Sequence, residues 1–378
     1  MLLGGGHSHL AVLKHFGETG PLGVRLTLIS RNVVTPYSGM LPGMIAGHYS
    51  PEDAHINLTA LARFGGAHTV FDEAVGLDLA GGRVLLRDLP AVPFDLLSID
   101  IGSTPNLSVP GAMEHAVPVK PIDRLVRRWS LLCDRVRADP ERQVLAVVGG
   151  GAAGVELVLA AQARLRALLR EPSHWSRIEY HLFTDRDDLL STHSRRVRRI
   201  FRRVLRERGV MVHLGHPVTE VAHGRLRTAD GTWHEANEVV WSTEATAVPW
   251  LGQSGLAVDP NGFIRVSSSL QSISHERVFA SGDIASMVDH PRERSGALAV
   301  QQGPWLADNL VRALRGEPLR THRPRQRFLS LISTGNRYAV ASYGAFAFEG
   351  AWVWRWKDRI DRRFTRSYTE LPLTASSH

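Results

Sequence analysis

Two stretches of the sequence place a short apolar run before a cluster of glycines. In the first, residues 2–3 lead into glycines at 4–6, and in the second, residues 144–148 lead into glycines at 149–151. Apolar residues at helical spacing follow both clusters and continue over 152–169 in the second. A strand, a glycine turn and a helix in this order are typical of dinucleotide-binding folds. The repeat therefore predicts a duplicated nucleotide-binding unit.

The rest of the pattern predicts how these units are assembled. Further strands are expected at 24–29, 178–183 and 210–214, and a late helix at 297–314. We predict an α/β fold with two Rossmann-like domains, the second inserted in the first. The predicted domains are 1–120 with 256–325, 121–255, and a small C-terminal region at 326–378. The first strand is shorter than the about five residues usual for a buried strand, which suggests a true start upstream of Met1.

Charge and composition narrow the classes of partner. The net charge is +8 and comes from arginine, because Lys14, Lys120 and Lys357 are the only lysines. A basic surface suits nucleic acid, an anionic membrane or anionic cofactors. The sequence contains no nucleic-acid-binding motif, so we expect no nucleic-acid partner. Without a basic leader or a run of about 18 apolar residues, we expect a cytoplasmic protein.

The second glycine cluster fits G-x-G-x-x-G in full. Gly149 would permit a tight turn, Gly151 would let the backbone approach a pyrophosphate, and Gly154 would let helix and strand pack closely. The helix N-terminus, with Ala152 and Ala153, would supply N–H groups and a positive dipole end. We predict a dinucleotide site here.

The first cluster matches only the first two glycines, because His9 stands in the third position. His7 or His9 could instead ligate a metal. No cysteine or carboxylate cluster accompanies them, so we predict no metal site.

The residues that would contact the ribose of each nucleotide do not identify the nucleotide in either unit. An acidic residue is expected after the second strand of each unit, where it binds the ribose 2′-hydroxyl. The first unit has Ser30 and Arg31 there, and Arg31 could stack on adenine or meet a phosphate. In the second unit Asp185 favours NADH, whereas Arg186 suits the 2′-phosphate of NADPH. Both nucleotides stay open.

Several motifs together resemble the two-dinucleotide-binding flavoproteins of the pyridine nucleotide-disulfide oxidoreductase superfamily. Within it the chain resembles the type II NADH dehydrogenase branch, and above all the FAD-dependent oxidoreductase domain associated with selenide, water dikinase. The motifs that carry the resemblance lie at 4–9, 35–43, 98–105, 278–283 and 352–361. The resemblance implies FAD in the domain 1–120 with 256–325, and NAD(P)H in the domain 121–255.

The resemblance also implies roles for individual residues. Asp283 would bind the ribitol or a phosphate, the loop 35–43 would pack near the isoalloxazine, and the backbone of Val75 would bind adenine. The residues expected around FAD are Gly4, Gly5, Gly6, His7, Ser8, Ser30, Arg31, Pro36, Ser38, Gly39, Leu41, Pro42, Val75, Gly102, Gly282 and Asp283. Those expected around NAD(P)H are Gly149, Gly151, Ala152, Ala153, Gly154 and Asp185. Glu156 falls where the family places a carboxylate close to nicotinamide and flavin.

Two positions depart from the pattern of the family. Glu244 replaces the glycine of the second linker, where a side chain could disturb the turn or the cofactor. In the quinone motif Ala297 replaces the first glutamine, and Gln301-Gln302 occupies the second region, so Gln301 and Gln302 join Glu156 as candidate catalytic residues.

The number of cysteines in the sequence limits which electron acceptors are possible. Cys133 is the only cysteine and lies in an arginine-rich helical pattern, where we expect no catalytic role for it. Disulfide reductases and sulfide:quinone reductases need more than one cysteine, so both activities are excluded. A small-molecule acceptor remains, with a quinone as one candidate. The alternative to an enzyme is a flavin-binding module for partner recognition with slow turnover, linked to selenium metabolism.

The C-terminal region contains a basic amphipathic pattern. Trp352, Val353, Trp356, Ile360 and Phe364 fall on one predicted face, ringed by arginines. This face could lie on an anionic membrane at the inner side of the cell, or dock on the protein's own core. We expect core docking with weak peripheral membrane contact, and a homodimer is open.

Overall fold

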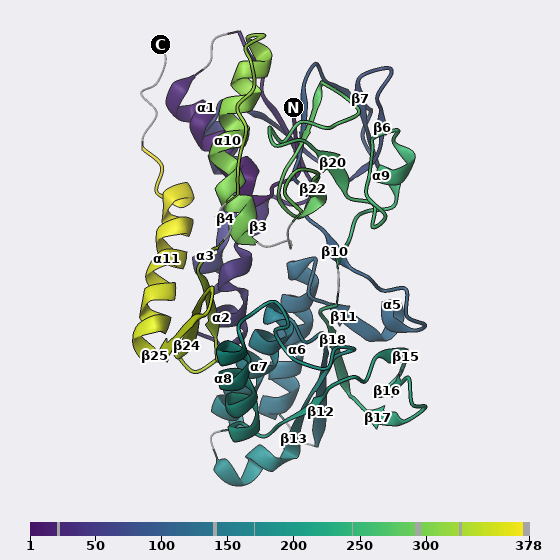
Figure 1. Cartoon of the computed structure of the whole chain (residues 1–378), viewed down its shortest axis with the longest axis vertical. Helices are drawn as coiled ribbons and strands as arrows, with labels where there is room; N and C mark the ends of the chain where they lie inside the picture. Colours follow the sequence, from purple (N-terminus) through teal and green to yellow (C-terminus); the bar gives the residue numbers. More distant parts are fainter. Residues whose placement is uncertain are drawn as a thin grey trace.

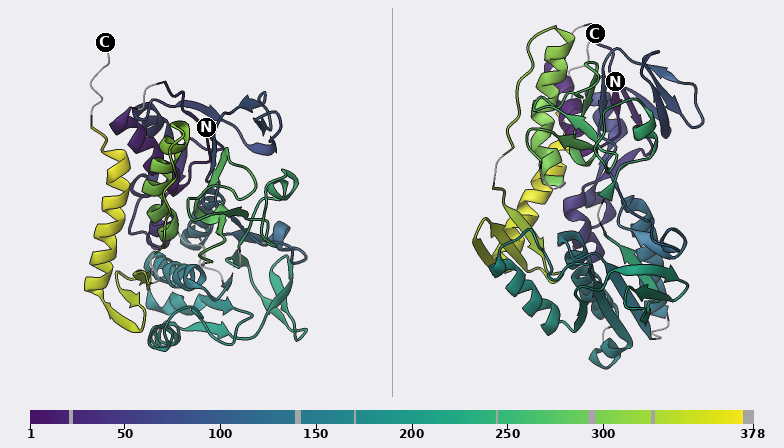
Figure 2. Two further views of the ribbon diagram at one scale, coloured as in Figure 1. Left: turned by 45° about the horizontal axis from the view of Figure 1, so that its top comes forward. Right: turned by 45° about the vertical axis from the view of Figure 1, so that its right-hand side comes forward.

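The structure is a computed structural model, which describes residues 1–20, 23–138, 142–169, 171–243, 245–291, 296–324 and 327–372. The chain forms two lobes, each built on a five-stranded parallel sheet, with a C-terminal helix along one side (Figures 1 and 2). The α/β prediction with two Rossmann-like lobes is therefore confirmed.

The first lobe contains the sheet β21-β9-β1-β2-β5, with β1 at its centre. β1 has only two residues, yet it pairs in parallel with both β2 and β9 and is fully buried. The strands of this sheet are β1 (Leu2–Leu3), β2 (Thr27–Ser30), β5 (His68–Phe71), β9 (Leu97–Ile99) and β21 (Val278–Ala280). Smaller strands surround it: β3 (Val34–Pro36), β4 (His55–Asn57), β6 (Ala74–Asp78), β7 (Arg83–Leu86), β8 (Val92–Pro93), β20 (Ile264–Val266) and β22 (Ala285–Met287).

Two long helices of this lobe, α1 and α10, pack along each other (Figure 1). Gly303 of α10 permits the close approach, because a Cβ there would lie 2.7 Å from the Cβ of Ala11. The helices of the first lobe are α1 (His7–Thr19), η1 (Ser38–Met40), α3 (Pro51–Ala54), α4 (Leu58–Phe64), α9 (Trp250–Gln253), η3 (Gly282–Ile284) and α10 (Gly296–Leu314). The short helix α2 (Leu41–Ile45) follows η1, but its buried residues join the core of the second lobe.

The second lobe contains the parallel sheet β11-β18-β12-β13-β14 and the antiparallel meander β15-β16-β17. Its strands are β11 (Ala116–Pro118), β12 (Gln143–Val148), β13 (Ile178–Phe183), β14 (Val210–His213), β15 (Val218–Ala222), β16 (Arg225–Thr228), β17 (Trp233–Glu235) and β18 (Glu238–Trp241). Its helices are α5 (Ala112–His115), α6 (Ile122–Ala138), α7 (Ala152–Leu169), η2 (Pro172–Arg177) and α8 (Arg195–Glu207). Cys133 is buried in α6, and burial raises the pKa of its thiol.

The paired strands β10 (Thr104–Pro105) and β19 (Ala245–Thr246) carry the chain from the first lobe to the second and back. The predicted boundaries at 120/121 and 255/256 are therefore displaced. β11 lies before residue 121 but belongs to the second sheet, and Leu251 of α9 lies before residue 256 but packs in the core of the first lobe. Glu244, where the second linker departs from the family pattern, lies outside the described residues.

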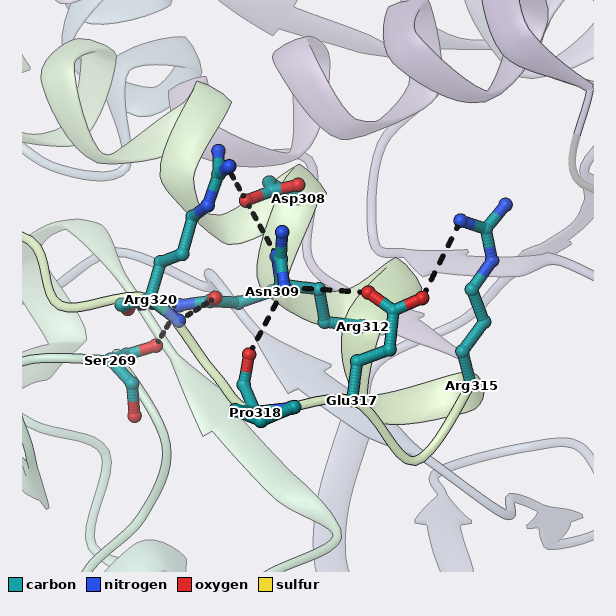
Figure 3. Close-up of polar contacts among 8 residues, drawn as sticks. All are labelled: Ser269, Asp308, Asn309, Arg312, Arg315, Glu317, Pro318 and Arg320. Carbon is teal, nitrogen blue, oxygen red and sulfur yellow. Dashed lines mark hydrogen bonds and ion pairs between the residues drawn. The ribbon is translucent and has the colours of Figure 1, made fainter.

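A polar cluster holds the segment that leaves α10 (Figure 3). The buried Asn309 amide donates to the carbonyls of Ser269 and Arg320, both at 2.8 Å, and its oxygen accepts from the Arg320 amide. Ion pairs of Arg320 with Asp308 and of Arg312 with Glu317 surround it. These contacts fix the segment around Arg320, which follows α10, to the first lobe.

The C-terminal region comprises β23 (Ser330–Ser333), β24 (Ala339–Tyr343), β25 (Phe346–Gly350) and α11 (Ala351–Thr369). The predicted apolar face of α11 is wrong in part. Val353 is fully buried and Phe364 packs against the first-lobe core, but Trp352, Trp356 and Ile360 are 50%, 41% and 41% exposed. The inward line instead carries the charged residues Lys357 and Asp361, which pair with each other.

Candidate functional site

The first glycine turn connects β1 to α1 at the carboxyl end of the sheet. Gly4 has a φ of +99°, and a Cβ there would lie 2.3 Å from the carbonyl oxygen of Asp100. Gly6 requires glycine for a reason that the motif did not indicate. A Cβ at Gly6 would lie 2.2 Å from the side-chain carboxyl carbon of Asp100, so this glycine makes room for a carboxylate.

His9 fills the third glycine position without disrupting the turn. It is fully buried, and its Nδ1 lies 2.7 Å from the carbonyl of Gly4, which can only accept. Nδ1 therefore carries the proton, and Nε2 accepts from the Ser98 hydroxyl at 2.8 Å. Burial lowers the pKa of His9 to about 4. Both ring nitrogens are engaged, so in this conformation His9 offers no lone pair to a metal ion.

A cavity of about 470 Å³ opens in front of the first turn and lies between the lobes. Residues 120–123 of the second-lobe side complete its wall, together with Trp250. The predicted FAD residues that line it are Gly4, Gly5, Gly6, His7, Ser30, Arg31, Pro36, Ser38, Gly102 and Asp283. Gly102 has a φ of +72° with open space beside it, at the end of β9.

Other predicted FAD residues do not line this cavity: Ser8, Gly39, Leu41, Pro42, Val75 and Gly282. Ser8 is buried, and its hydroxyl donates to the Ala299 carbonyl. Leu41 and Pro42 begin α2, where Leu41 joins the second-lobe core. The wall near Val75 is formed by residues 72–74 instead, and Val75 is 40% exposed.

An ion pair inside the cavity was not foreseen. Lys120 pairs with Asp283, whose carboxylate also accepts from the Ser103 hydroxyl at 3.4 Å. Although burial opposes ionisation, Lys120 holds the pKa of Asp283 below its usual range. The rarity of lysine in the sequence could have pointed to this pair. The chain has three lysines, and two of them, Lys120 and Lys357, form ion pairs with aspartates.

Asp100 is the second unforeseen residue. It is 2% exposed, and its Oδ2 accepts from the amides of Ser8 at 2.9 Å and His9 at 3.4 Å, at the start of α1. Burial raises the pKa of Asp100 to about 7 against the effect of these donors. The carboxyl therefore titrates near neutrality.

At the second glycine turn, the three motif glycines differ in the space around them. Gly149 has a φ of +129°, and a Cβ would lie 2.2 Å from the carbonyl oxygen of Ser242. A Cβ at Gly154 would lie 2.0 Å from the carbonyl of Gly149. Gly151 instead faces open space, with no atom within 4 Å of its Cβ position. The turn thus leaves room for a ligand at the start of α7, where Ala152 and Ala153 follow.

These turns fit the expected cofactors. The first offers a cavity beside a helix N-terminus for FAD, and the second offers an open glycine at another helix N-terminus for a pyridine nucleotide. Asp185 is 63% exposed after β13 and lies 3.7 Å from Arg186, so the choice between NADH and NADPH stays open.

Glu156 connects the second turn to the C-terminal region. Its carboxylate accepts from the Ser333 amide at 2.6 Å, and burial raises its pKa to about 7 while Lys357 lowers it. The Lys357 ammonium donates to the Gly39 carbonyl at 2.6 Å and to Asp361 at 2.5 Å. The Tyr37 hydroxyl also bonds Asp361. Glu156 does not line the cavity described above.

Gln302 and Gln301 lie on α10. Gln302 is 1% exposed, and its oxygen accepts from the Gly282 amide at 2.7 Å, next to Asp283. Neither glutamine lines the cavity. This contact gives Gln302 a role in holding the Gly282–Asp283 turn.

Comparison with known proteins agrees with this architecture. The model of the family described as pyridine nucleotide-disulphide oxidoreductase matches residues 1–304. A relative from Arabidopsis thaliana, the alternative NAD(P)H-ubiquinone oxidoreductase C1, is 26% identical over 71% of this chain and 55% of its own length. The demethylphylloquinone reductase NdbB of Synechocystis is 27% identical over 65% of this chain and 62% of its own length. The chain thus spans just over half the length of these two relatives.

Solved structures show the same fold. NDH2 from Plasmodium falciparum in complex with NADH superposes with a TM-score of 0.80 at 14% identity, covering 100% of this chain and 99% of that chain. The sulfide:quinone oxidoreductase of Aquifex aeolicus gives 0.81 at 16% identity, covering 98% and 92%.

Proposed function

Because the chain belongs to the pyridine nucleotide-disulphide oxidoreductase family, we propose that it takes a hydride from NAD(P)H onto FAD and delivers the electrons to a quinone. Membership confirms the predicted oxidoreductase class and the two cofactors. The observation that carries the proposal is the interlobe cavity at the first glycine turn, on the same chain as a second turn whose Gly151 is open.

FAD, when bound, supplies the hydride-accepting ring, and this chain's residues supply binding and orientation. The N-terminus of α1 faces the cavity beside Gly6, where it favours a diphosphate. Lys120 and Asp283 form a fixed ion pair in the wall, and Gln302 holds the turn that carries Asp283. His7 packs edge-on against Tyr37 and Phe364, and burial lowers its pKa to about 4, so it is neutral.

The quinone is favoured by the relatives and by the cysteine count. Both curated relatives described above act on quinones by name. Cys133 is the only cysteine and is buried in α6. The chain therefore lacks the pair of cysteines that reduction of disulfides or oxidation of sulfide would need. Quinone reduction also consumes protons, and Glu156 is a carboxyl that titrates near neutrality between the second turn and the C-terminal region. We assign proton delivery on the acceptor side to Glu156.

Peripheral membrane contact is supported by an exposed apolar patch, which we define as Phe346, Phe348, Trp352, Trp356 and Ile360. Phe346 and Phe348 are 60% and 54% exposed. A shallow hollow joins Phe348 and Trp352 to Arg196 and Arg199 of α8. No described helix is long and apolar enough to cross a membrane. Aromatic side chains beside arginines suit an anionic bilayer surface.

A vesicle assay tests this patch. Trp356→Ala should weaken binding to anionic vesicles, and the binding of wild type should fall as salt rises. Trp233→Ala is the matched control, because Trp233 is 36% exposed but lies on β17 at the opposite side of the molecule (Figure 1). Equal binding by all three proteins contradicts membrane contact through this patch. Loss of a dimer in Trp356→Ala, without vesicle binding by wild type, assigns the patch to a second copy.

The activity itself is tested by anaerobic mixing of the FAD-loaded protein with NADH or NADPH, followed by a screen of quinones. Gly151→Asp is the informative variant, because it adds a carboxylate where the nucleotide pyrophosphate would approach and meets open space in the fold. It should retain FAD and melt like wild type, yet be reduced far more slowly by NADH. Rapid bleaching of Gly151→Asp would remove the second turn from the mechanism, and a wild-type protein that rejects every quinone would remove the acceptor.

We also propose that the chain belongs with the oxidoreductase domains associated with selenide, water dikinase. The motifs at 4–9 and 98–105 support this proposal. The alternative function, a flavin-binding module for partner recognition with slow turnover, loses one of its supports. His9 replaces the third glycine without disrupting the turn, because both of its ring nitrogens are hydrogen-bonded.

A further inference from the structure

Asp100 lies where an anionic ligand of the first turn would bind. Its carboxylate accepts from the Ser8 and His9 amides, at the start of the helix that faces the cavity, and Asp100 itself lines that cavity. A dinucleotide's diphosphate is expected at the same helix start. Two anions would therefore compete for one positive end of a helix.

The Asp100 side chain fills the space that two glycines leave free and packs closely against both. A Cβ at Gly6 would lie 2.2 Å from one side of the carboxyl group, and a Cβ at Gly282 would lie 2.5 Å from its Oδ1. With the Ser8 amide bonded as well, the group has little freedom to turn away from an incoming ligand. The Asp100 carboxylate therefore cannot easily change its rotamer to move away from the diphosphate.

The other charged groups around it do not neutralise it. Asp283 adds a second negative charge, and Lys120 is already paired with Asp283. Within the described part of the chain, Asp100 has no ion-pair partner. His7 and His9, which also lie here, are neutral because burial lowers the pKa of each to about 4. The Met1 amine lies beside His9, and burial lowers its pKa to about 6.

We propose, building on the FAD site proposed above, that Asp100 holds the flavin diphosphate as the neutral acid, so that FAD binding takes up one proton. The proton comes from solvent and forms the O–H bond of the Asp100 carboxyl group, and no other bond changes. A neutral carboxyl keeps a carbonyl oxygen for the Ser8 and His9 amides and gains an O–H that can donate to a phosphate oxygen. Asp100 is thus a positioning residue that links flavin affinity to pH.

The sign of the pH dependence follows from this linkage. The free carboxyl titrates at about 7. Below that pH the neutral acid is already present, and FAD affinity should be constant. Above it, each binding event must protonate Asp100, so the dissociation constant should rise about tenfold per pH unit.

The test uses the full chain loaded with FAD, diluted at set pH values from about 6 to about 9, with released flavin followed by its fluorescence. Wild type should show the tenfold slope above neutrality, and Asp100→Asn should be flat, because the amide keeps an acceptor for Ser8 but cannot ionise. Asp123→Asn is the matched control, because it removes another carboxyl group from the wall of the same cavity, and it should keep the wild-type slope. A slope shared by Asp100→Asn would assign the titration to another group, such as the Met1 amine, and overturn the proposal.

A second measurement needs no variant. Calorimetric binding of FAD to flavin-free wild type, in two buffers of different ionisation enthalpy, should show uptake of nearly one proton above neutral pH. Binding without proton uptake overturns the role of Asp100 while leaving the FAD site intact. A protein that binds no FAD at any pH would instead overturn the FAD site itself.

Discussion

The two glycine turns of this chain have the same order of strand, turn and helix but differ in what occupies the space around the turn. At the second turn, Gly151 faces open space and Gly154 lies against the backbone of Gly149, as the motif predicts. At the first, Asp100 occupies the space beside Gly6, and His9 replaces the third glycine. A glycine motif therefore identifies the turn, but its neighbours decide whether a glycine makes room for a ligand or for the protein itself.

The largest effect is expected where a glycine is enclosed by backbone. Gly149→Ala would place a Cβ 2.2 Å from the Ser242 carbonyl at a φ of +129°, and we expect it to lower the free energy of unfolding by about 2–4 kcal/mol. Gly151→Ala meets nothing and should change it by less than about 0.5 kcal/mol. Urea denaturation of the pair measures both. Similar losses in the two variants would contradict the distinction between enclosed and open glycines.

A smaller effect is expected at the unusual position of the first turn. Ser98→Ala removes the donor to His9 Nε2 and leaves a buried ring nitrogen without a partner, which should lower the free energy of unfolding by about 1–3 kcal/mol.

A double-mutant cycle isolates this contact. With His9→Ala as the second change, the coupling energy should fall between about 0.5 and 3 kcal/mol. Additive losses would show that the hydroxyl and the imidazole act independently. Any FAD loss in these variants can then be compared with the loss of stability.

A third expected effect depends on pH and concerns Glu156, two residues beyond the second turn. Burial raises its pKa to about 7 in the fold, so ionisation is disfavoured there compared with the unfolded chain. The resulting loss of stability is complete above pH 7 and disappears as the pH falls toward the ordinary value of about 4.3. Glu156→Gln should therefore gain stability relative to wild type at alkaline pH, and this gain should shrink on acidification.

Melting curves of both proteins across this range measure the difference. A gap in melting temperature that is independent of pH would show that the pKa of Glu156 is the same in the folded and the unfolded chain, so that the fold does not raise it. If quinone turnover falls in Glu156→Gln while the protein gains stability at alkaline pH, proton delivery and folding are separated.

Features that depend on a local pattern of residues could be predicted from the amino-acid sequence alone. Apolar runs before glycines placed both turns, and the three roles predicted for Gly149, Gly151 and Gly154 agree with the space around each. The single cysteine excluded the chemistry that needs two thiols, because a residue count is independent of folding. The predicted α/β fold is confirmed because strand and helix periods, and the freedom of glycine at positive φ, are properties of neighbouring residues.

Contacts between residues that lie far apart in the chain could be found only in the folded structure. Asp100 reaches the Ser8 amide across 92 positions, and Lys120 reaches Asp283 across 163. On α11, the apolar pattern selected the tryptophan line as the inner face, but burial of the Lys357–Asp361 pair turned Trp352 and Trp356 outward. A buried ion pair counts as polar in any pattern along the sequence. Only the packing of α11 against the loop that carries Gly39 and Tyr37 supplies the partners that make its burial favourable.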